Sequence, residues 1–169
     1  MIPPRPPPGD EQVDIVDEAD NVVGIAPRRE VRAKRLKHRC VFIVVRATRG
    51  HVLIHRRSDA KDLWPGRWDL AAGGVLGAGE GWEDSARREL QEELGIASAL
   101  VPLGGGAYED ADVDEIAKIY AVRHDGPFAF SDGEVVEAFF VSLDDLAQRI
   151  ERDPFVPDSV ALVWPLIRG

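Results

Sequence analysis

The stretch Gly74–Ile96 reads GVLGAGEGWEDSARRELQEELGI. Its first part is rich in glycine, and residues 82–94 then follow with the apolar spacing of an amphipathic helix. Gly95 stands where glycine most commonly ends a helix, because glycine adopts a positive φ without strain. The stretch therefore predicts a tight glycine loop that leads into a helix over 82–94.

Three glutamates of this helix lie on or near its buried side. On a helical wheel of about 100° per residue with Ala86 at zero, Leu90 falls at about 40°, Glu93 at about 340°, Glu89 at about 300° and Glu92 at about 240°. Burying an unpaired carboxylate costs on the order of several kcal/mol, and like charges four residues apart repel. The sequence must therefore supply compensation for these carboxylates.

Two interpretations of the three glutamates remain open. They could form a solvated acidic face, as most glutamate runs do, and Arg88 could pair with Glu92 four residues on. The angular position of Glu93 counts against a fully solvated face, and one arginine cannot neutralise three carboxylates. A hard divalent cation would neutralise them, since Mg²⁺ takes oxygen ligands from a few carboxylates, waters and substrate phosphate.

Strand patterns surround this helix. The continuous apolar run at 40–47 is typical of a central strand that is covered on both faces. Further elements are predicted as strands in 12–27 with a turn at Asp20-Asn21, strands within 51–57, 68–71, 116–123 and 138–141, and a helix over about 142–151. We expect an α/β fold, a three-layered sandwich with a mixed sheet between helices and a β-hairpin at the N-terminal side.

The stretch matches a family pattern from its first glycine to its last isoleucine. The pattern G-x5-E-x7-R-E-U-x-E-E-x-G-U, with U aliphatic, is the Nudix box, and every defined position is filled between Gly74 and Ile96. The chain thus resembles the Nudix hydrolases, whose fold is an α/β/α sandwich. The resemblance implies that Glu89, Glu92 and Glu93 hold Mg²⁺ or Mn²⁺, with the backbone carbonyl of Gly74 as a further ligand.

The resemblance also implies a reaction. Nudix hydrolases cleave a nucleoside diphosphate linked to another moiety, or a similar diphosphate, by attack of water on one phosphorus while the metal neutralises charge on the phosphate oxygens. Glu80 and Arg88 would orient the loop and the helix through charge-assisted hydrogen bonds.

The general base is left open by the box. In some relatives a glutamate from a loop outside the box serves, and Glu134, just before a predicted strand, is our candidate. Glu137 and Glu115 are rivals for this role. A box glutamate is the other option for activating the water, and a solvated loop carboxylate is the alternative interpretation of each candidate.

Substrate-binding residues are expected next to the box. Arg56 and Arg57 follow one another on a strand and point to opposite faces, so at most one of them meets the substrate. Trp64 is a candidate for stacking on a base. Specificity is expected in loops around 58–68 and 104–115. The four histidines show no ligand spacing, and Cys40, in an apolar strand, is expected to be inert.

Composition limits the class of protein. The 169 residues carry a formal net charge of −9, which argues against a binder of nucleic-acid polymers but not against a small diphosphate ligand. One cysteine excludes an internal disulfide framework and favours a cytoplasmic location. No apolar run is long enough to span a membrane. Residues 1–10 are rich in proline and predict a disordered tail, and residues 11–169 predict a single domain.

The segment before the box resembles the branch of the family that contains the isopentenyl-diphosphate isomerases and their hydrolase-like cousins. Those isomerases use a cysteine after a tryptophan-containing loop, whereas residues 68–74 read WDLAAGG. This departure favours hydrolysis over isomerisation. A non-catalytic nucleotide sensor is a third hypothesis, and the complete carboxylate set argues against it. A homodimer is consistent with the resemblance.

Overall fold

The central strand β3, His38–Arg46, carries the core of the molecule on both of its faces. In the computed structural model, which describes residues 3–169, Val41 and Ile43 belong to one hydrophobic cluster and Phe42 and Val44 to another. Successive side chains of a strand point to opposite faces, so an unbroken apolar run supplies both clusters. The prediction of a doubly covered central strand is confirmed.

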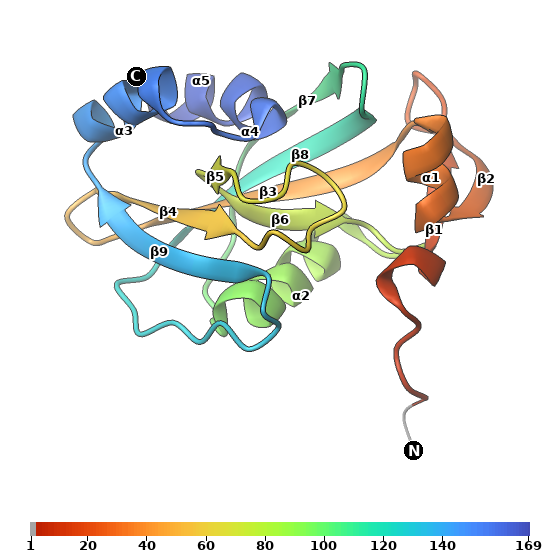
Figure 1. Ribbon diagram of the computed structural model, residues 1–169, viewed down its shortest axis with the longest axis horizontal. Coiled ribbons are helices and arrows are strands. Elements are labelled where there is room, and N and C mark those ends of the chain that lie inside the picture. The colour runs from red at the N-terminus through yellow and green to blue at the C-terminus, as the bar shows by residue number, and fades with distance from the viewer. Residues whose placement is uncertain (1–2) are drawn as a thin grey trace.

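The other elements lie around β3 as Figure 1 shows. The strands are β1 Gln12–Val16, β2 Val22–Pro27, β4 Val52–Arg57, β5 Trp68–Asp69, β6 Ala72–Val75, β7 Val101–Glu109, β8 Asp114–Arg123 and β9 Val135–Val141. The helices are the 3-10 helix η1 Pro8–Asp10 and the α-helices α1 Arg28–Lys34, α2 Trp82–Leu94, α3 Leu143–Arg152, α4 Pro157–Leu162 and α5 Trp164–Ile167. Helix α2 covers one face of the sheet and α3 to α5 cover the other.

The sheet is mixed. Strand β3 pairs in parallel with β8 and antiparallel with β6, while β7 pairs antiparallel with β8. Strand β4 pairs antiparallel with β5 and β9, and β1 and β2 form a separate antiparallel hairpin. The predicted α/β/α sandwich with a mixed sheet and an N-terminal hairpin is confirmed.

One predicted loop is wrong. The segment 104–115 is mostly strand, because β7 extends to Glu109 and β8 begins at Asp114. The glycines of β7 are poor strand formers, so the sequence pattern does not indicate a strand here. They occur because atoms of neighbouring elements leave no room for a side chain. A Cβ on Gly105 would lie 2.7 Å from the carbonyl oxygen of Ala117 on β8.

The predicted helix ends agree with the structure. Helix α2 covers residues 82–94, as its apolar spacing and the glycine after it predict. The side chain of Ser142 caps α3 by accepting a hydrogen bond from the backbone N–H of Asp145 at 3.1 Å.

The proline-rich segment contacts α2 through Arg5 and α1 through Pro8–Asp10. Its first two residues are outside the described part of the chain, Arg5 forms an ion pair with Glu92, and Pro8–Asp10 form η1. The disorder of residues 1–10 and the domain boundary at residue 11 stay predictions. Among residues 3–169, no helix is both long and apolar enough to cross a membrane.

Candidate active site

A glycine-rich turn connects β6 of the sheet to α2. Strand β6 leads into a loop in which Glu80 accepts a hydrogen bond from the backbone N–H of Gly77 at 3.1 Å. From the N-terminal hairpin, Asp14 accepts another from Gly79 at 2.8 Å. Helix α2 ends at Gly95, which has a φ of 67°. The loop that leads into the helix is thus held by its own Glu80 and by Asp14 of β1.

Arg88 is the centre of a charged network on this helix. It donates two hydrogen bonds of 2.8 Å to Glu80, one of 2.9 Å to Glu89 and one of 3.2 Å to Glu92. It also donates to the carbonyl of Val75 at 3.3 Å. These bonds raise the pKa of Arg88 and, against the effect of burial, lower the pKa of Glu80. The arginine therefore stays charged and joins the helix to β6.

Two of the box glutamates are buried. Glu89 is 7% exposed and Glu93 is 3% exposed, and Glu93 accepts a long hydrogen bond from the N–H of Gly73. Burial raises the pKa of Glu89 to about 7 although the charge of Arg88 opposes it. Burial and the nearby charge of Glu89 raise the pKa of Glu93 well above its ordinary value. The nearby cations therefore do not fully compensate the burial of the Glu89 and Glu93 carboxyl groups.

Glu89 contacts the sheet at Gly74. A Cβ on Gly74 would lie 2.5 Å from Oε1 of Glu89, so only glycine leaves the carboxylate its place. Buried carboxylates next to a backbone carbonyl form the all-oxygen donor set that Mg²⁺ and Mn²⁺ prefer. The residues present therefore fit the divalent ion that the sequence predicts.

Glu92 and Glu134 line a hollow of about 240 Å³ together with Glu89. Glu134 comes from the loop before β9 and forms an ion pair of 2.9 Å with Lys61. That ion pair lowers the pKa of Glu134 although burial opposes it. Of the three candidate bases, Glu134 alone lines this hollow, since Glu137 pairs with Arg56 at 3.7 Å.

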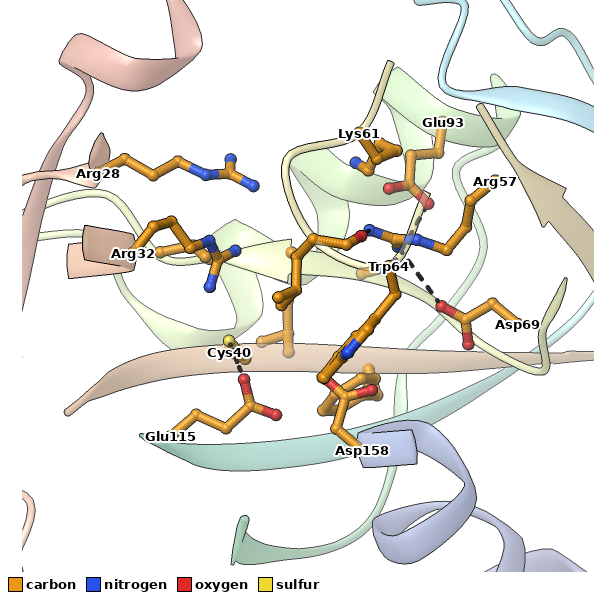
Figure 2. A pocket seen from close by; sticks show the side chains of 16 residues that line it. Arg28, Arg32, Cys40, Arg57, Lys61, Trp64, Asp69, Glu93, Glu115 and Asp158 are labelled. Carbon is orange, nitrogen blue, oxygen red and sulfur yellow. Dashed lines mark hydrogen bonds and ion pairs between the residues drawn. The ribbon is translucent and has the colours of Figure 1, made fainter. Parts of the chain in front are cut away.

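The third candidate, Glu115, lies at the far end of an inner pocket of about 60 Å³. Figure 2 shows Glu93 near one end of this pocket, Trp64 across its middle, and Glu115 and Asp158 at the other end. Arg57 also lines it and donates to the carbonyl of Leu63 at 2.8 Å. Of the two predicted arginines, Arg57 thus lies in the pocket and Arg56 lies outside it.

Several pocket residues were missed by the sequence analysis. Arg28 and Lys61 line both the hollow and the inner pocket, and Arg32 lines the pocket beside Arg28. Asp62 lies 3.3 Å from the side-chain nitrogens of both arginines, whose charges lower its pKa against the effect of burial. Lys61 and Asp62 do lie in the loop 58–68, where the sequence predicts specificity. No prediction pointed to Arg28 and Arg32, because spacing along the chain does not place α1 opposite the box.

The fold and the site together define a class: α/β/α sandwiches in which a glycine-rich turn brings an acidic helix to a mixed sheet. A family model described as the NUDIX domain matches residues 36–161. The chain belongs to the Nudix hydrolase family and is a hydrolase of that family.

Similar proteins cover nearly all of the chain. An uncharacterized Nudix hydrolase of Yersinia pestis is 41% identical over 152 residues, which are 89% of this chain and 82% of that protein. An uncharacterized Nudix hydrolase of Streptomyces coelicolor is 40% identical over 155 residues, 90% of this chain and 86% of that protein.

Solved structures agree in fold. The crystal structure of DR0079 from Deinococcus radiodurans has a TM-score of 0.78 at 28% identity and covers 94% of this chain and 98% of that one. The NUDIX domain of NrtR from Shewanella oneidensis, solved as a complex with ADP ribose, has a TM-score of 0.63 at 18% identity, covering 77% and 85%.

Proposed function

We propose that this Nudix hydrolase cleaves the diphosphate linkage of a nucleoside diphosphate derivative or a similar small metabolite and that it depends on Mg²⁺ or Mn²⁺. The observation that carries the proposal is the burial of Glu89 against Gly74 and of Glu93 beside Gly73, in a site that Arg28 and Lys61 also line. A buried pair of carboxylates with cationic side chains nearby suits a polyanion that binds together with a divalent ion.

The residues of the box have two roles, metal binding and positioning. Glu89, Glu92, Glu93 and the carbonyl of Gly74 would hold the ion, which when bound supplies the positive charge that diphosphate cleavage needs. Arg88 acts as a positioning residue, because its hydrogen bonds fix Glu89 and Glu92 on the helix while Glu80 anchors it to the loop.

Glu134 accepts the proton of the attacking water. Its position on the hollow with Glu89 and Glu92 favours it over Glu137 and Glu115, and its ion pair with Lys61 keeps it ionised. A box glutamate remains the second candidate. The electron pair of the water oxygen forms the new bond to phosphorus, and the bridging oxygen leaves with the second phosphate.

The remainder of the substrate lies toward the inner pocket. Arg28 and Lys61 stand between the hollow and the pocket and bind phosphate oxygens, while Arg57 and Trp64 contact the group attached to the diphosphate. The bound ADP ribose in the NrtR domain supports a nucleoside diphosphate joined to a second moiety as the substrate class. A cytoplasmic location and a homodimer complete the proposal.

Isomerisation of a prenyl diphosphate is the alternative activity, and it would place the chain in the isomerase-like branch. The absence of cysteine from residues 68–74 favours hydrolysis. A nucleotide sensor without activity is the other alternative. The burial of Glu89 and Glu93 argues against it, because a sensor does not need this costly pair of carboxylates.

The deciding experiment is a panel of nucleoside di- and triphosphates, nucleotide sugars, dinucleotides, coenzyme A derivatives and isopentenyl diphosphate, each with Mg²⁺, Mn²⁺ or excess chelator. We expect release of a phosphorylated fragment that carries one oxygen from ¹⁸O-labelled water, and no product with chelator. A shifted double bond without phosphate release would support the isomerase, and no turnover of any compound would support the sensor.

A variant of Glu93 tests the assignment of the metal ligands. Glu93→Gln removes the charge of one ligand and keeps its size, so we expect turnover to fall by two or more orders of magnitude while the fold is unchanged (about 10²–10³ is typical for one lost electrostatic contact). Glu83→Gln on the exposed face of α2 is the matched control and should leave turnover unchanged. Equal turnover of the two variants at saturating Mg²⁺ would remove Glu93 from the site.

A further inference from the structure

Three side chains with metal-binding atoms meet where β3 and β8 begin. In the parallel register His38 stands opposite Glu115, and Cys40 follows two residues after His38. Residues at i and i+2 of a strand share a face, and so does the residue paired with the first of them. The fold therefore brings a nitrogen, a sulfur and a carboxylate donor together on one face of the sheet.

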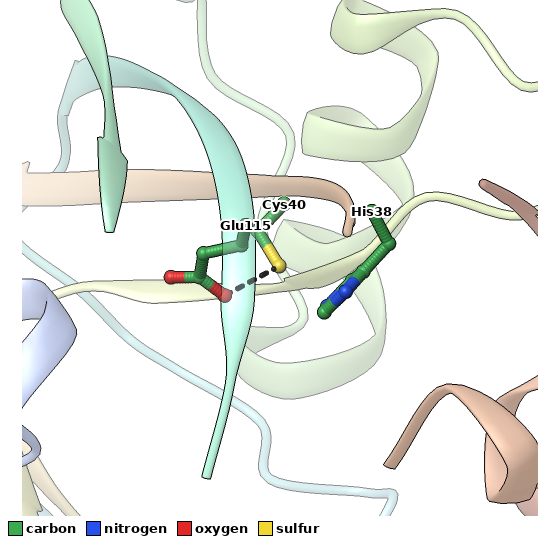
Figure 3. Close-up of side chains that lie close together, drawn as sticks. All are labelled: His38, Cys40 and Glu115. Atoms are coloured by element: carbon green, nitrogen blue, oxygen red, sulfur yellow. Dashed lines mark hydrogen bonds between the residues drawn. The ribbon is translucent and has the colours of Figure 1, made fainter. Parts of the chain in front are cut away.

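The three groups are close and buried. Their ligand atoms all lie within 4.8 Å of one another, as Figure 3 shows from nearby. The Sγ atom of Cys40 donates to Oε2 of Glu115 at 3.1 Å. His38 and Glu115 are each 1% exposed and Cys40 is 6% exposed. The trio is thus removed from solvent and distinct from the box carboxylates on α2.

One nitrogen of His38 has no partner among the described residues. Nδ1 of His38 lies 2.8 Å from the carbonyl oxygen of Leu36, so Nδ1 carries the proton and Nε2 keeps its lone pair. Within the described part of the chain, that Nε2 is buried without a hydrogen-bond partner, and Oε1 of Glu115 has none apart from the carboxyl group of Asp158. An unpaired buried polar atom costs on the order of 1–3 kcal/mol, and a histidine whose other nitrogen donates to a carbonyl is the usual form of a histidine metal ligand.

Burial favours the neutral forms of the three side chains. Burial lowers the pKa of His38 to about 4, so its imidazole is neutral. Burial raises the pKa of the Cys40 thiol and of the Glu115 carboxyl, although the charge of Arg32 opposes both shifts. Asp158 lies beside them on the same inner pocket, and its pKa is raised by burial and by Glu115.

We propose that His38, Cys40 and Glu115 bind one borderline-soft divalent ion such as Zn²⁺, with Asp158 or a water of the inner pocket as fourth ligand. Sulfur and imidazole ligands select Zn²⁺ and Co²⁺, whereas the oxygen donors of the box select Mg²⁺ and Mn²⁺. Bonds of about 2.0–2.3 Å in tetrahedral geometry separate ligand atoms by about 3.3–3.6 Å. The Sγ and Oε2 atoms, 3.1 Å apart, are already near those separations.

The single cysteine makes the test specific. Because the chain has only one cysteine, a thiolate-to-cobalt charge-transfer band in the near ultraviolet can report this site alone. The full-length protein, freed of metal, is titrated with Co²⁺ in an excess of Mg²⁺ that occupies the box. We expect a charge-transfer band that saturates at one Co²⁺ per chain and that Zn²⁺ abolishes by displacement.

Matched variants locate the ligands. Cys40→Ser should lose the band, and His38→Gln and Glu115→Gln should weaken Co²⁺ binding at least tenfold, since even an outer partner of a ligand is worth about 10–100-fold in affinity. Glu93→Gln should keep both band and affinity. Circular dichroism without metal checks that each variant is folded.

Two results would overturn the proposal. One is a folded wild-type chain that shows no charge-transfer band with Co²⁺, which needs no variant at all. The other is a band that Glu115→Gln and His38→Gln, both folded, leave at the wild-type affinity, because the cysteine would then bind cobalt without the other two.

Discussion

The missing side chain of Gly74 leaves the space that the carboxylate of Glu89 fills. Its neighbour Gly73 is glycine for a different reason, since a Cβ there would lie 1.9 Å from the carbonyl oxygen of Val41. In the first case the obstacle is the end of a flexible side chain, and in the second it is backbone. Gly74 is therefore required by the site, and the adjacent Gly73 is required by the fold.

This difference predicts opposite outcomes for two alanine variants. Gly74→Ala displaces Glu89 and should weaken the affinity for Mg²⁺ at least tenfold with little loss of stability, because a ligand must move but no backbone does. Gly73→Ala pushes backbone apart and should cost on the order of 3 kcal/mol or more of unfolding free energy. Urea unfolding and Mg²⁺-dependent activity measure the two effects, and a reversal of the pattern contradicts the assignment.

The raised pKa of Glu89 predicts a pH dependence of stability. With its folded pKa at about 7 and its ordinary value at 4.5, the folded chain binds more protons than the unfolded chain between these pH values. The free energy of unfolding of the metal-free protein therefore falls as pH rises through this window, by at most about 1.4 kcal/mol per pH unit for one proton.

Urea unfolding in EDTA across that pH range, compared with Glu89→Gln, isolates this contribution. The variant has no carboxyl to ionise and should lose the falling component of the wild-type curve. Parallel curves for the two proteins would show that Glu89 ionises freely in the folded state.

At the level of elements, α2 was predicted to the residue and β7 was missed. The helix carries local signals, namely its apolar spacing and Gly95 with its positive φ. The strand carries Gly104, Gly105 and Gly106, which are poor strand formers, and its pairing is set by neighbours. A Cβ on Gly106, for example, would lie 3.0 Å from Leu162 of α4, a contact invisible in the sequence.

The end of α2 supports a stability prediction. Gly95→Ala adds strain of about 1–2 kcal/mol for an L-residue with positive φ, and its Cβ would also lie 2.8 Å from that of Ala129. Gly79→Ala is the matched control, since Gly79 has a φ of 75° and open space around it. We expect Gly95→Ala to lower the free energy of unfolding by more than Gly79→Ala does, as measured with urea, and an equal loss would show that the Ala129 contact relaxes without cost.

At the level of the whole molecule, the inner pocket is assembled from segments far apart in the chain. Arg28 comes from α1, Lys61 and Trp64 from the loop after β4, Glu115 from β8 and Asp158 from α4. The box could be identified from spacing because one helix and one turn place all of its residues. The pocket could not, because no local pattern records which distant segments the mixed sheet brings together.

Binding of a divalent ion at the box should stabilise the whole fold. An ion that binds only the folded chain adds about 2.7 kcal/mol at a concentration of 100 times its dissociation constant, which for a domain of this size raises Tm by about 5–10 °C. Calorimetry in Mg²⁺ and in EDTA measures the shift, and Glu93→Gln should reduce it. A Tm that does not respond to Mg²⁺ or Mn²⁺ would contradict a metal site at the box.

The ion pair between Arg5 and Glu92 has a practical consequence for whoever purifies this protein. An affinity tag fused ahead of Arg5 is tethered beside the hollow that Glu92 lines, where its histidines could capture the very ion under assay. The carboxyl end follows α5, on the sheet face opposite α2 (Figure 1). Kinetic and metal-binding work is therefore best done with the tag attached after Gly169.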